Sequence, residues 1–139
     1  MSAERRRAFL LEGTRTAKVA TVAPRDGRPH VTPIWFVLDG EDVMFTTDRT
    51  SVKGRALRHD PRISLCIDDD RPPFAFVMID GVASISEELS ELRRWATRIG
   101  GRYMGADRAE EFGARNGVPG ELLVRVTPTR IIAEDGVAN

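Results

Sequence analysis

Residues 45–57 read Phe45-Thr-Thr-Asp-Arg-Thr-Ser-Val-Lys-Gly-Arg-Ala-Leu57, and they describe a strand that gives way to a helix. Ser51 suits the N-cap of this helix, and Asp60-Pro61 ends it. Lys53 and Arg55 fall in its first turn, where the helix dipole disfavours positive charge. Free N–H groups, hydroxyls and two cations at a helix start predict an anion site. A solvated, charged helix is the alternative that the spacing leaves open.

Before this segment the sequence alternates as strands do. The pattern predicts strands over 16–22, 30–38 and 42–47, with turns at Asp26-Gly27 and Asp39-Gly40. Pro33 interrupts the second strand, which is therefore expected to be bulged or to lie on a sheet edge there. Three strands joined by short turns predict an antiparallel meander.

After the segment, strands are expected over 62–68 and 74–86, with a bulge at Gly81, and over 122–132, broken near Pro128. Helices are expected over 3–12, 88–99 and 107–115, and Gly100-Gly101 is expected to end the second of these. The chain therefore reads as mainly β with short helices. We expect one domain, residues 1–139, folded as a closed or split antiparallel β-barrel.

The composition excludes several classes of protein. The 21 basic and 21 acidic residues cancel, which argues against a general nucleic-acid binder. Cys66 is the only cysteine, so it can form no disulfide within the chain, and it is expected to behave as a small buried hydrophobe. No apolar stretch approaches the roughly 20 residues that cross a membrane. No secretory signal is evident, and a cytoplasmic protein is expected.

Three segments carry a family resemblance: Gly27-Arg-Pro-His-Val-Thr-Pro-Ile-Trp35, Phe45-Thr-Thr47 and Ser51-Val-Lys-Gly-Arg-Ala-Leu-Arg-His-Asp-Pro61. Together they resemble the pyridoxamine-phosphate-oxidase-like split β-barrel proteins, and most closely the coenzyme F420-dependent (deazaflavin) reductases among them. The resemblance covers nearly the whole chain, including Asp80-Gly81. It identifies the fold more specifically than the cofactor.

The resemblance implies a homodimer that binds its cofactor at the subunit interface. The cofactor phosphate would be held by Thr46, Thr47, Ser51, Lys53 and Arg55. The strand that contains His30, Thr32, Pro33, Ile34 and Trp35 would lie along the ring system, and Phe74 would contribute from the partner subunit. Arg28 and Arg58 are candidates for the acidic tail that F420 has and FMN lacks.

Two departures from the family pattern argue against oxidation of vitamin B6. The second strand lacks the arginine-to-lysine phosphate motif of the authentic oxidases, and the end of the chain, 133–139, is acidic where theirs is basic. The expected function is an F420-dependent oxidoreductase that transfers hydride to a hydrophobic, unsaturated small molecule. An FMN-binding oxidoreductase and a non-catalytic carrier of a flavin or haem-like ligand are the alternatives.

His30 and the acidic run 68–70 are of residue types that often act in catalysis or bind metals. His30 lies near the expected ring, but hydride transfer requires positioning more than a protein acid, so no catalytic side chain is assigned. Asp68, Asp69 and Asp70 precede a turn and are expected to be solvated, with no metal bound there.

Overall fold

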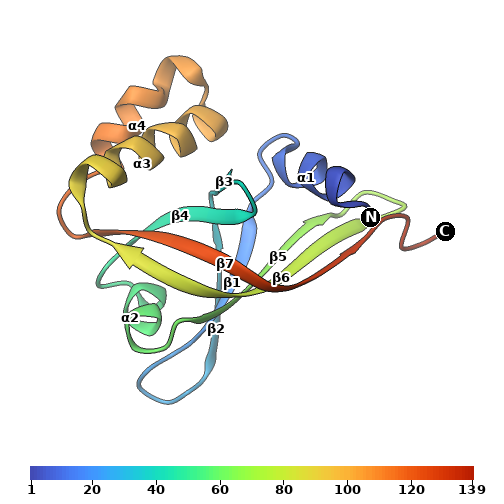
Figure 1. Cartoon of the computed structure of the whole chain (residues 1–139), viewed down its shortest axis with the longest axis horizontal. Helices are drawn as coiled ribbons and strands as arrows, with labels where there is room; N and C mark the ends of the chain where they lie inside the picture. The colour runs from blue at the N-terminus through green and yellow to red at the C-terminus, as the bar shows by residue number, and fades with distance from the viewer.

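Seven strands form a single sheet in the computed structural model, which describes all 139 residues (Figure 1). The strands are β1 (Ala17–Val22), β2 (Pro29–Ile34), β3 (Val37–Asp39), β4 (Asp42–Asp48), β5 (Arg62–Asp69), β6 (Ala75–Ser86) and β7 (Glu121–Glu134). The helices are α1 (Ala3–Leu11), α2 (Val52–His59), α3 (Leu89–Met104) and α4 (Ala109–Asn116), with a 3-10 turn, η1 (Ala106–Arg108), before α4. All neighbouring strands are antiparallel, in the order β2-β1-β5-β6-β7-β4-β3.

The sheet curls into a split barrel, as the sequence predicted. Strands β2 and β3 stand at opposite edges of the sheet, although only Trp35 and Phe36 separate them in the chain. The two edges must therefore come close together at these two residues. The predicted meander is wrong at this point, because 30–38 forms two strands that do not pair with each other. Pro33 lies within the edge strand β2, where a residue without an N–H is tolerated.

Along each strand every second residue faces inward, and these residues form the core of the barrel. In β6, for example, Val77 and Ile79 are buried while Phe76 and Met78 are partly exposed on the outer face. The N-terminal helix α1 adds Phe9 to this core. A second, smaller cluster lies outside the barrel, where α3 packs Leu92 and Trp95 against Met44 of β4 and Leu123 of β7. Helix α3 therefore covers the outer face of the sheet near its β3–β4 edge.

Helix α3 continues through Gly100-Gly101, where the sequence predicted its end. The glycines allow α3 and α4 to approach each other closely. A Cβ atom on Gly100 would lie 2.4 Å from Cβ of Phe112 in α4, so only glycine lets the two helices pack here. None of the helices is both long enough and apolar enough to cross a membrane.

The irregularity predicted at Gly81 is present. The β6–β7 register slips between Asp80 and Gly81, and Thr129 is the extra residue, with its hydroxyl donating to the Asp80 carbonyl at 3.1 Å. A Cβ on Gly81 would lie 2.7 Å from the Thr127 carbonyl oxygen. Strand β7 absorbs Pro128 in this bulge and runs on unbroken, so the predicted break is wrong.

Candidate functional site

The loop between β4 and α2 is organised by hydroxyl groups. Ser51 caps α2 by accepting from the Gly54 N–H at 3.0 Å, and its own hydroxyl lies 2.7 Å from the Asp48 carbonyl and 3.0 Å from the Thr47 hydroxyl. A Cβ on Gly54 would lie 2.3 Å from that same carbonyl, so glycine is required at this turn. The N–H groups of Val52 and Lys53 have no acceptor within the helix, as at every helix start. Thr47 and Ser51 thus organise the start of α2, where the sequence predicted an anion site.

A pocket of about 330 Å³ opens beside this helix start. It lies where the two edges of the sheet approach each other, between β2 and β4. The residues that line it are Thr16, Pro33, Ile34, Trp35, Thr46, Lys53, Ile99 and Asn116. Five of them were predicted from the sequence to contact a cofactor: Pro33, Ile34, Trp35, Thr46 and Lys53. The structure therefore brings residues from three separate segments to one cavity.

The remaining wall of the pocket was not anticipated. Ile99 comes from α3 and Asn116 from the end of α4, so the helices between β6 and β7 close one side. Ile99 belongs to an apolar stripe whose spacing predicts only core packing. Asn116 lies at the end of a short helix, and no motif there indicates a binding site. Thr16, just before β1, carries no signal either.

Trp35 is held in place by α3. Its indole stacks on the Tyr103 ring with centroids 5.0 Å apart, and it also contacts the Phe112 ring at 5.9 Å. Arg102 donates from Nη1 to the Phe36 carbonyl at 2.8 Å and from Nη2 to the Leu10 carbonyl at 2.7 Å. These contacts fix the crossover between β2 and β3, and with it one wall of the pocket.

The charges at the pocket are few and partly buried. Burial lowers the pKa of Lys53, while the nearby Glu121 carboxylate acts in the opposite direction. Burial raises the pKa of Glu121, Asp48 raises it further, and Lys53 and the Thr46 side chain lower it. Because burial disfavours its charged form, Lys53 gains from an anion bound beside it. Glu121 was missed in the sequence, since only the β4–β7 pairing brings it here.

Other predicted residues lie outside this pocket. His30 and Thr32 point to the opposite face of β2 from Pro33, and the buried atoms His30 Nδ1 and Thr32 Oγ1 have no hydrogen-bond partner within the chain. Arg28, Arg55 and Arg58 are exposed. Phe74 is also exposed, before β6, in a separate cavity near the C-terminus. Their roles in cofactor binding stay predictions.

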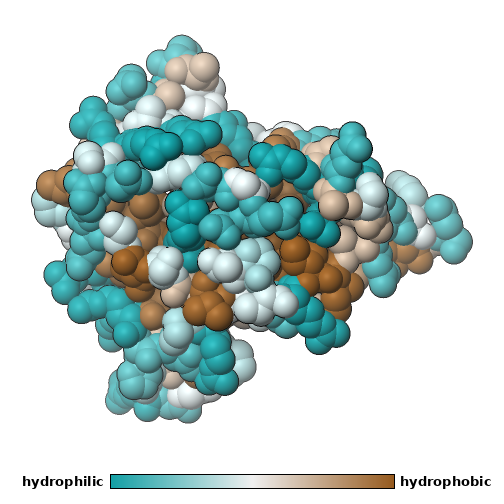
Figure 2. Space-filling model, viewed as in Figure 1, coloured by the Kyte–Doolittle hydropathy of each residue, from teal (hydrophilic) through white to brown (hydrophobic).

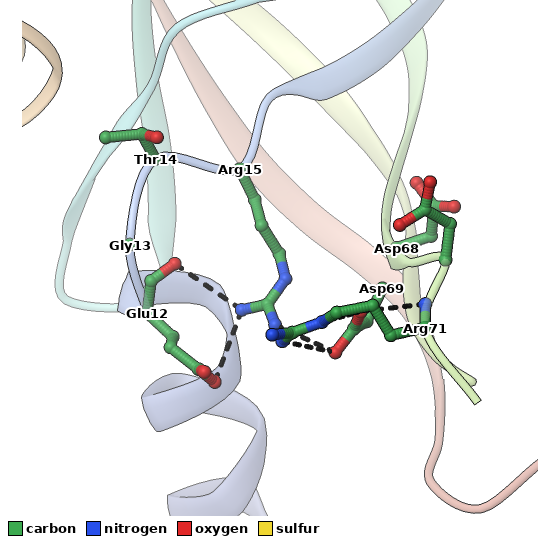
Figure 3. Close-up of a pocket in the computed structure, with 8 residues that line it drawn as sticks. Glu12, Gly13, Thr14, Arg15, Asp68, Asp69 and Arg71 are labelled. Carbon is green, nitrogen blue, oxygen red and sulfur yellow. Dashed lines mark hydrogen bonds and ion pairs between the residues drawn. The ribbon is translucent and has the colours of Figure 1, made fainter. Parts of the chain in front are cut away.

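The acidic run 68–70 lines a different pocket, of about 410 Å³, that is entirely polar (Figure 3). Arg15 points into it between Glu12, at 3.3 Å, and Asp69, at 3.2 Å. Arg71 also pairs with Asp69, at 2.9 Å. The Asp69 carboxylate is therefore already engaged by two guanidinium groups, which tie α1 to β5.

Cys66 is only partly buried, on the outer face of β5 opposite Met78. Burial and the neighbouring Asp68 raise the pKa of its thiol, whereas Lys18 lowers it. A thiol with a raised pKa is a poor nucleophile near neutrality, which fits the packing role predicted for it.

Three solved structures share this fold over most of their length. The conserved hypothetical protein Rv2991 from Mycobacterium tuberculosis is 29% identical, with a TM-score of 0.85, and the match covers 98% of this chain and 86% of that one. An F420 reductase is 26% identical with a TM-score of 0.70, over 90% of this chain and 94% of that one. HutZ, the haem storage protein from Vibrio cholerae, is 22% identical with a TM-score of 0.76, over 99% and 98%, and shows the fold alone.

Family comparison agrees with the fold. No curated protein matches this chain. The family model described as pyridoxamine 5'-phosphate oxidase matches residues 3–134, which is nearly the whole chain. The family includes oxidoreductases, and the structural neighbours by their names include both a reductase and a haem storage protein. The protein therefore belongs to the pyridoxamine 5'-phosphate oxidase family, with the split-barrel fold that its sequence predicted.

Proposed function

We propose that this protein is an oxidoreductase that binds coenzyme F420 in the pocket between β2 and β4. One observation carries the proposal: Pro33, Ile34, Trp35, Thr46 and Lys53 line one cavity at the start of α2. Residues that the family resemblance assigns to the ring and to the phosphate thus lie next to each other. The pocket joins an apolar wall to a cation, as a tricyclic ring with a phosphate requires.

The surroundings of the pocket fit such a ligand. Strand β2 is an edge strand, so the backbone groups on its outer edge have no strand partner and can bind the polar edge of a ring. Lys53 and the free N–H groups of α2 suit the phosphate. Trp35, fixed against Tyr103, supplies a flat apolar surface and excludes water.

When bound, F420 supplies the hydride chemistry, and the protein supplies binding, orientation and exclusion of water. No side chain is assigned as a proton donor. His30 is not among the residues that line the pocket, so positioning is the role we assign to the residues that do.

F420 is preferred over FMN for two reasons. The F420 reductase is 26% identical to this chain over nearly its whole length. In addition, Arg28, Arg55 and Arg58 give more exposed positive charge than one phosphate needs, and the F420 tail carries several carboxylates. The substrate would be a hydrophobic, unsaturated small molecule.

A homodimer would complete the site. On the outer face of β2, β1, β5 and β6, exposed apolar residues lie among polar ones such as Lys18 and Asp68, and they include Val31, which is 65% exposed, and Val82, which is 45% exposed. Figure 2 shows hydrophobic surface gathered along the sheet, toward the lower half of the view. A second copy on this face would enclose a ligand that one barrel leaves open, with Phe74 reaching in from the partner.

Titration of the purified protein with F420, FMN and haemin, followed by absorbance and fluorescence, tests the proposal. F420 is expected to bind most tightly, and the bound reduced cofactor is expected to be oxidised as it transfers hydride to an electron-poor alkene, with the second hydrogen supplied as a proton from solvent. Tighter binding of FMN would replace F420 by FMN as the cofactor. Tight binding of haemin, without F420 binding, would make the protein a carrier.

A further inference from the structure

A carboxylate, that of Glu121, lies near the proposed phosphate site. Glu121 is the first residue of β7 and pairs with Asp48 of β4, and Thr46 lies two residues further along β4. Paired residues project to the same face of a sheet, as do residues two apart in one strand. Glu121 therefore shares the outer face of β4 and β7 with Thr46, a residue that lines the pocket.

The environment of Glu121 is set by three groups. Lys53 on α2 is the cation close to it, and Asp48 is the like charge across the strand pair. Asp48 already accepts from the N–H and hydroxyl of Thr50, so it has less need of Lys53 than Glu121 has. The loop that follows Asp48 is tied to β7 by the Arg49 N–H, which donates to the Gly120 carbonyl at 2.9 Å. This backbone bond fixes the start of β7, and with it Glu121, next to the loop that leads into α2.

We propose that Glu121 determines the specificity of this anion site, selecting a phosphodiester monoanion over a phosphate monoester dianion. The inference rests on the proposed function, because it concerns the phosphate of the cofactor in that pocket. FMN ends in a phosphate monoester, whereas the phosphate of F420 is a diester. The same glutamate therefore separates the two cofactors.

The two kinds of phosphate differ in charge. A phosphate monoester carries about −1.5 to −2 at pH 7, and a diester has only one ionised oxygen. Without Glu121, the positive charge of Lys53 and the helix start would favour the dianion. With Glu121 present, the two side-chain charges offset each other. The repulsion energy from Glu121 is proportional to the charge of the ligand, so it is about twice as large for the monoester as for the diester.

The test compares wild-type protein with Glu121→Gln at pH 8, using F420, FMN and riboflavin as probes. Removing the carboxylate is expected to tighten F420 binding by about threefold and FMN binding by about tenfold, since the second factor is roughly the square of the first. Riboflavin, which has no phosphate, is expected to bind unchanged. Glu134→Gln, an exposed residue at the far end of the same strand, is the control and is expected to alter none of the three. Equal changes for F420 and FMN, or none, would overturn the proposal.

Two further measurements keep this result interpretable. Circular dichroism and thermal unfolding establish that Glu121→Gln is folded, and Glu121→Ser provides a second neutral variant.

Should wild-type protein bind neither F420 nor FMN, the proposed function fails, but the effect of Glu121 on the charge of the bound phosphate is still tested with inorganic phosphate and dimethyl phosphate. In titrations that follow the backbone amide signals of residues 51–54, Glu121→Gln is expected to favour phosphate over dimethyl phosphate relative to wild type. An unchanged ratio would count against a role for Glu121.

Discussion

The indole ring of Trp35 lies parallel to the phenol ring of Tyr103, with 5.0 Å between centroids and 3° between planes. Trp35 belongs to the crossover that joins the two edges of the sheet, and Tyr103 belongs to α3, which packs outside the barrel. The Tyr103 hydroxyl also accepts from the Phe36 N–H at 3.2 Å and donates to the Arg15 carbonyl at 2.6 Å. One side chain thus joins the helix, the crossover and the chain entering β1, at the wall of the proposed cofactor pocket.

Tyr103→Phe should destabilise the protein while preserving the ring stack. It removes both hydrogen bonds of the hydroxyl and leaves a half-buried N–H and carbonyl without partners. We expect the free energy of unfolding to fall by about 1–3 kcal/mol, measured by urea denaturation. Tyr103→Leu, which also removes the stack, should cost about 0.5–1.5 kcal/mol more. Wild-type stability in Tyr103→Phe would show that the hydroxyl has no structural role.

Lys53→Ala should weaken F420 binding by about 1.5–3 kcal/mol, the range for a hydrogen bond to a charged group. The loss follows because the phosphate would lose the partly buried cation beside it. Fluorescence titration measures it. Arg7→Ala is the control, since it removes one exposed positive charge from α1, and Arg7 is not among the residues that line the pocket. Equal affinity in wild type and Lys53→Ala would mean that the phosphate binds elsewhere.

Local patterns in the sequence were enough to find the strands and helices. Alternation located the strands, and Ser51 with Asp60-Pro61 bounded α2 closely. Two errors have a common cause, because each depends on a partner far away in the chain. The break at Trp35-Phe36 reflects closure of the sheet, and the continuation of α3 through Gly100 reflects its packing on Phe112. Neither partner is visible in a local window.

The candidate site was predictable to the extent that its residues lie in motifs. Pro33 and Lys53 sit in segments that resemble a family, whereas Asn116 and Glu121 do not. Glu121 reaches the site because β7 pairs with β4, a pairing between residues more than seventy positions apart. The cations of the anion site could therefore be predicted from the sequence, but the nearby carboxylate of Glu121 could not.

A homodimer is the third prediction. Light scattering should give about twice the 15.5 kDa mass of the chain. Val31→Asp should weaken the dimer, because it places a charge on the proposed interface, where the apolar side chain of Val31 is 65% exposed. Val137→Asp, at an exposed position in the C-terminal segment, is the control. A stable monomer that still binds F420 fully would contradict both the dimer and the shared site.

Acid should destabilise the protein through two carboxyl groups. Hydrogen bonds from Arg62 lower the pKa of Asp60 to about 2, and those from Arg71 lower the pKa of Asp69. A carboxyl whose pKa is lower in the folded than in the unfolded chain stabilises the fold above its unfolded pKa of about 3.9, and this contribution is lost as the pH falls toward the folded pKa. The urea midpoint should therefore be nearly constant between about pH 7 and 5 and fall between about pH 4 and 2. Asp60→Asn with Asp69→Asn should flatten that fall, and an equally steep fall in the double variant would place the acid sensitivity in other groups.

The last prediction concerns the tail of the cofactor. Arg28, in the turn before β2, and Arg58, on α2, are exposed and have no carboxylate partner within the chain. If they meet the carboxylates of the F420 tail, Arg28→Ala with Arg58→Ala should weaken F420 binding and leave FMN binding nearly unchanged. The control is Arg6→Ala with Arg7→Ala, which removes the same charge from α1, away from the pocket and from the cavity that contains Phe74 (Figure 1).

Salt distinguishes contact with the tail from a general effect of net charge. Exposed charge pairs are screened beyond roughly 8–10 Å at about 0.10–0.15 M salt, so F420 affinity should fall as salt is added. The fall should be shallower in the double variant, because the screened pairs are already gone, whereas the α1 control should keep the wild-type slope. Lys53 is half-buried and would pair with the phosphate at short range, so FMN binding should depend less on salt than F420 binding does. FMN that binds as tightly as F420, with the same response to salt and to the double variant, would show that these arginines meet no tail and that FMN is the cofactor.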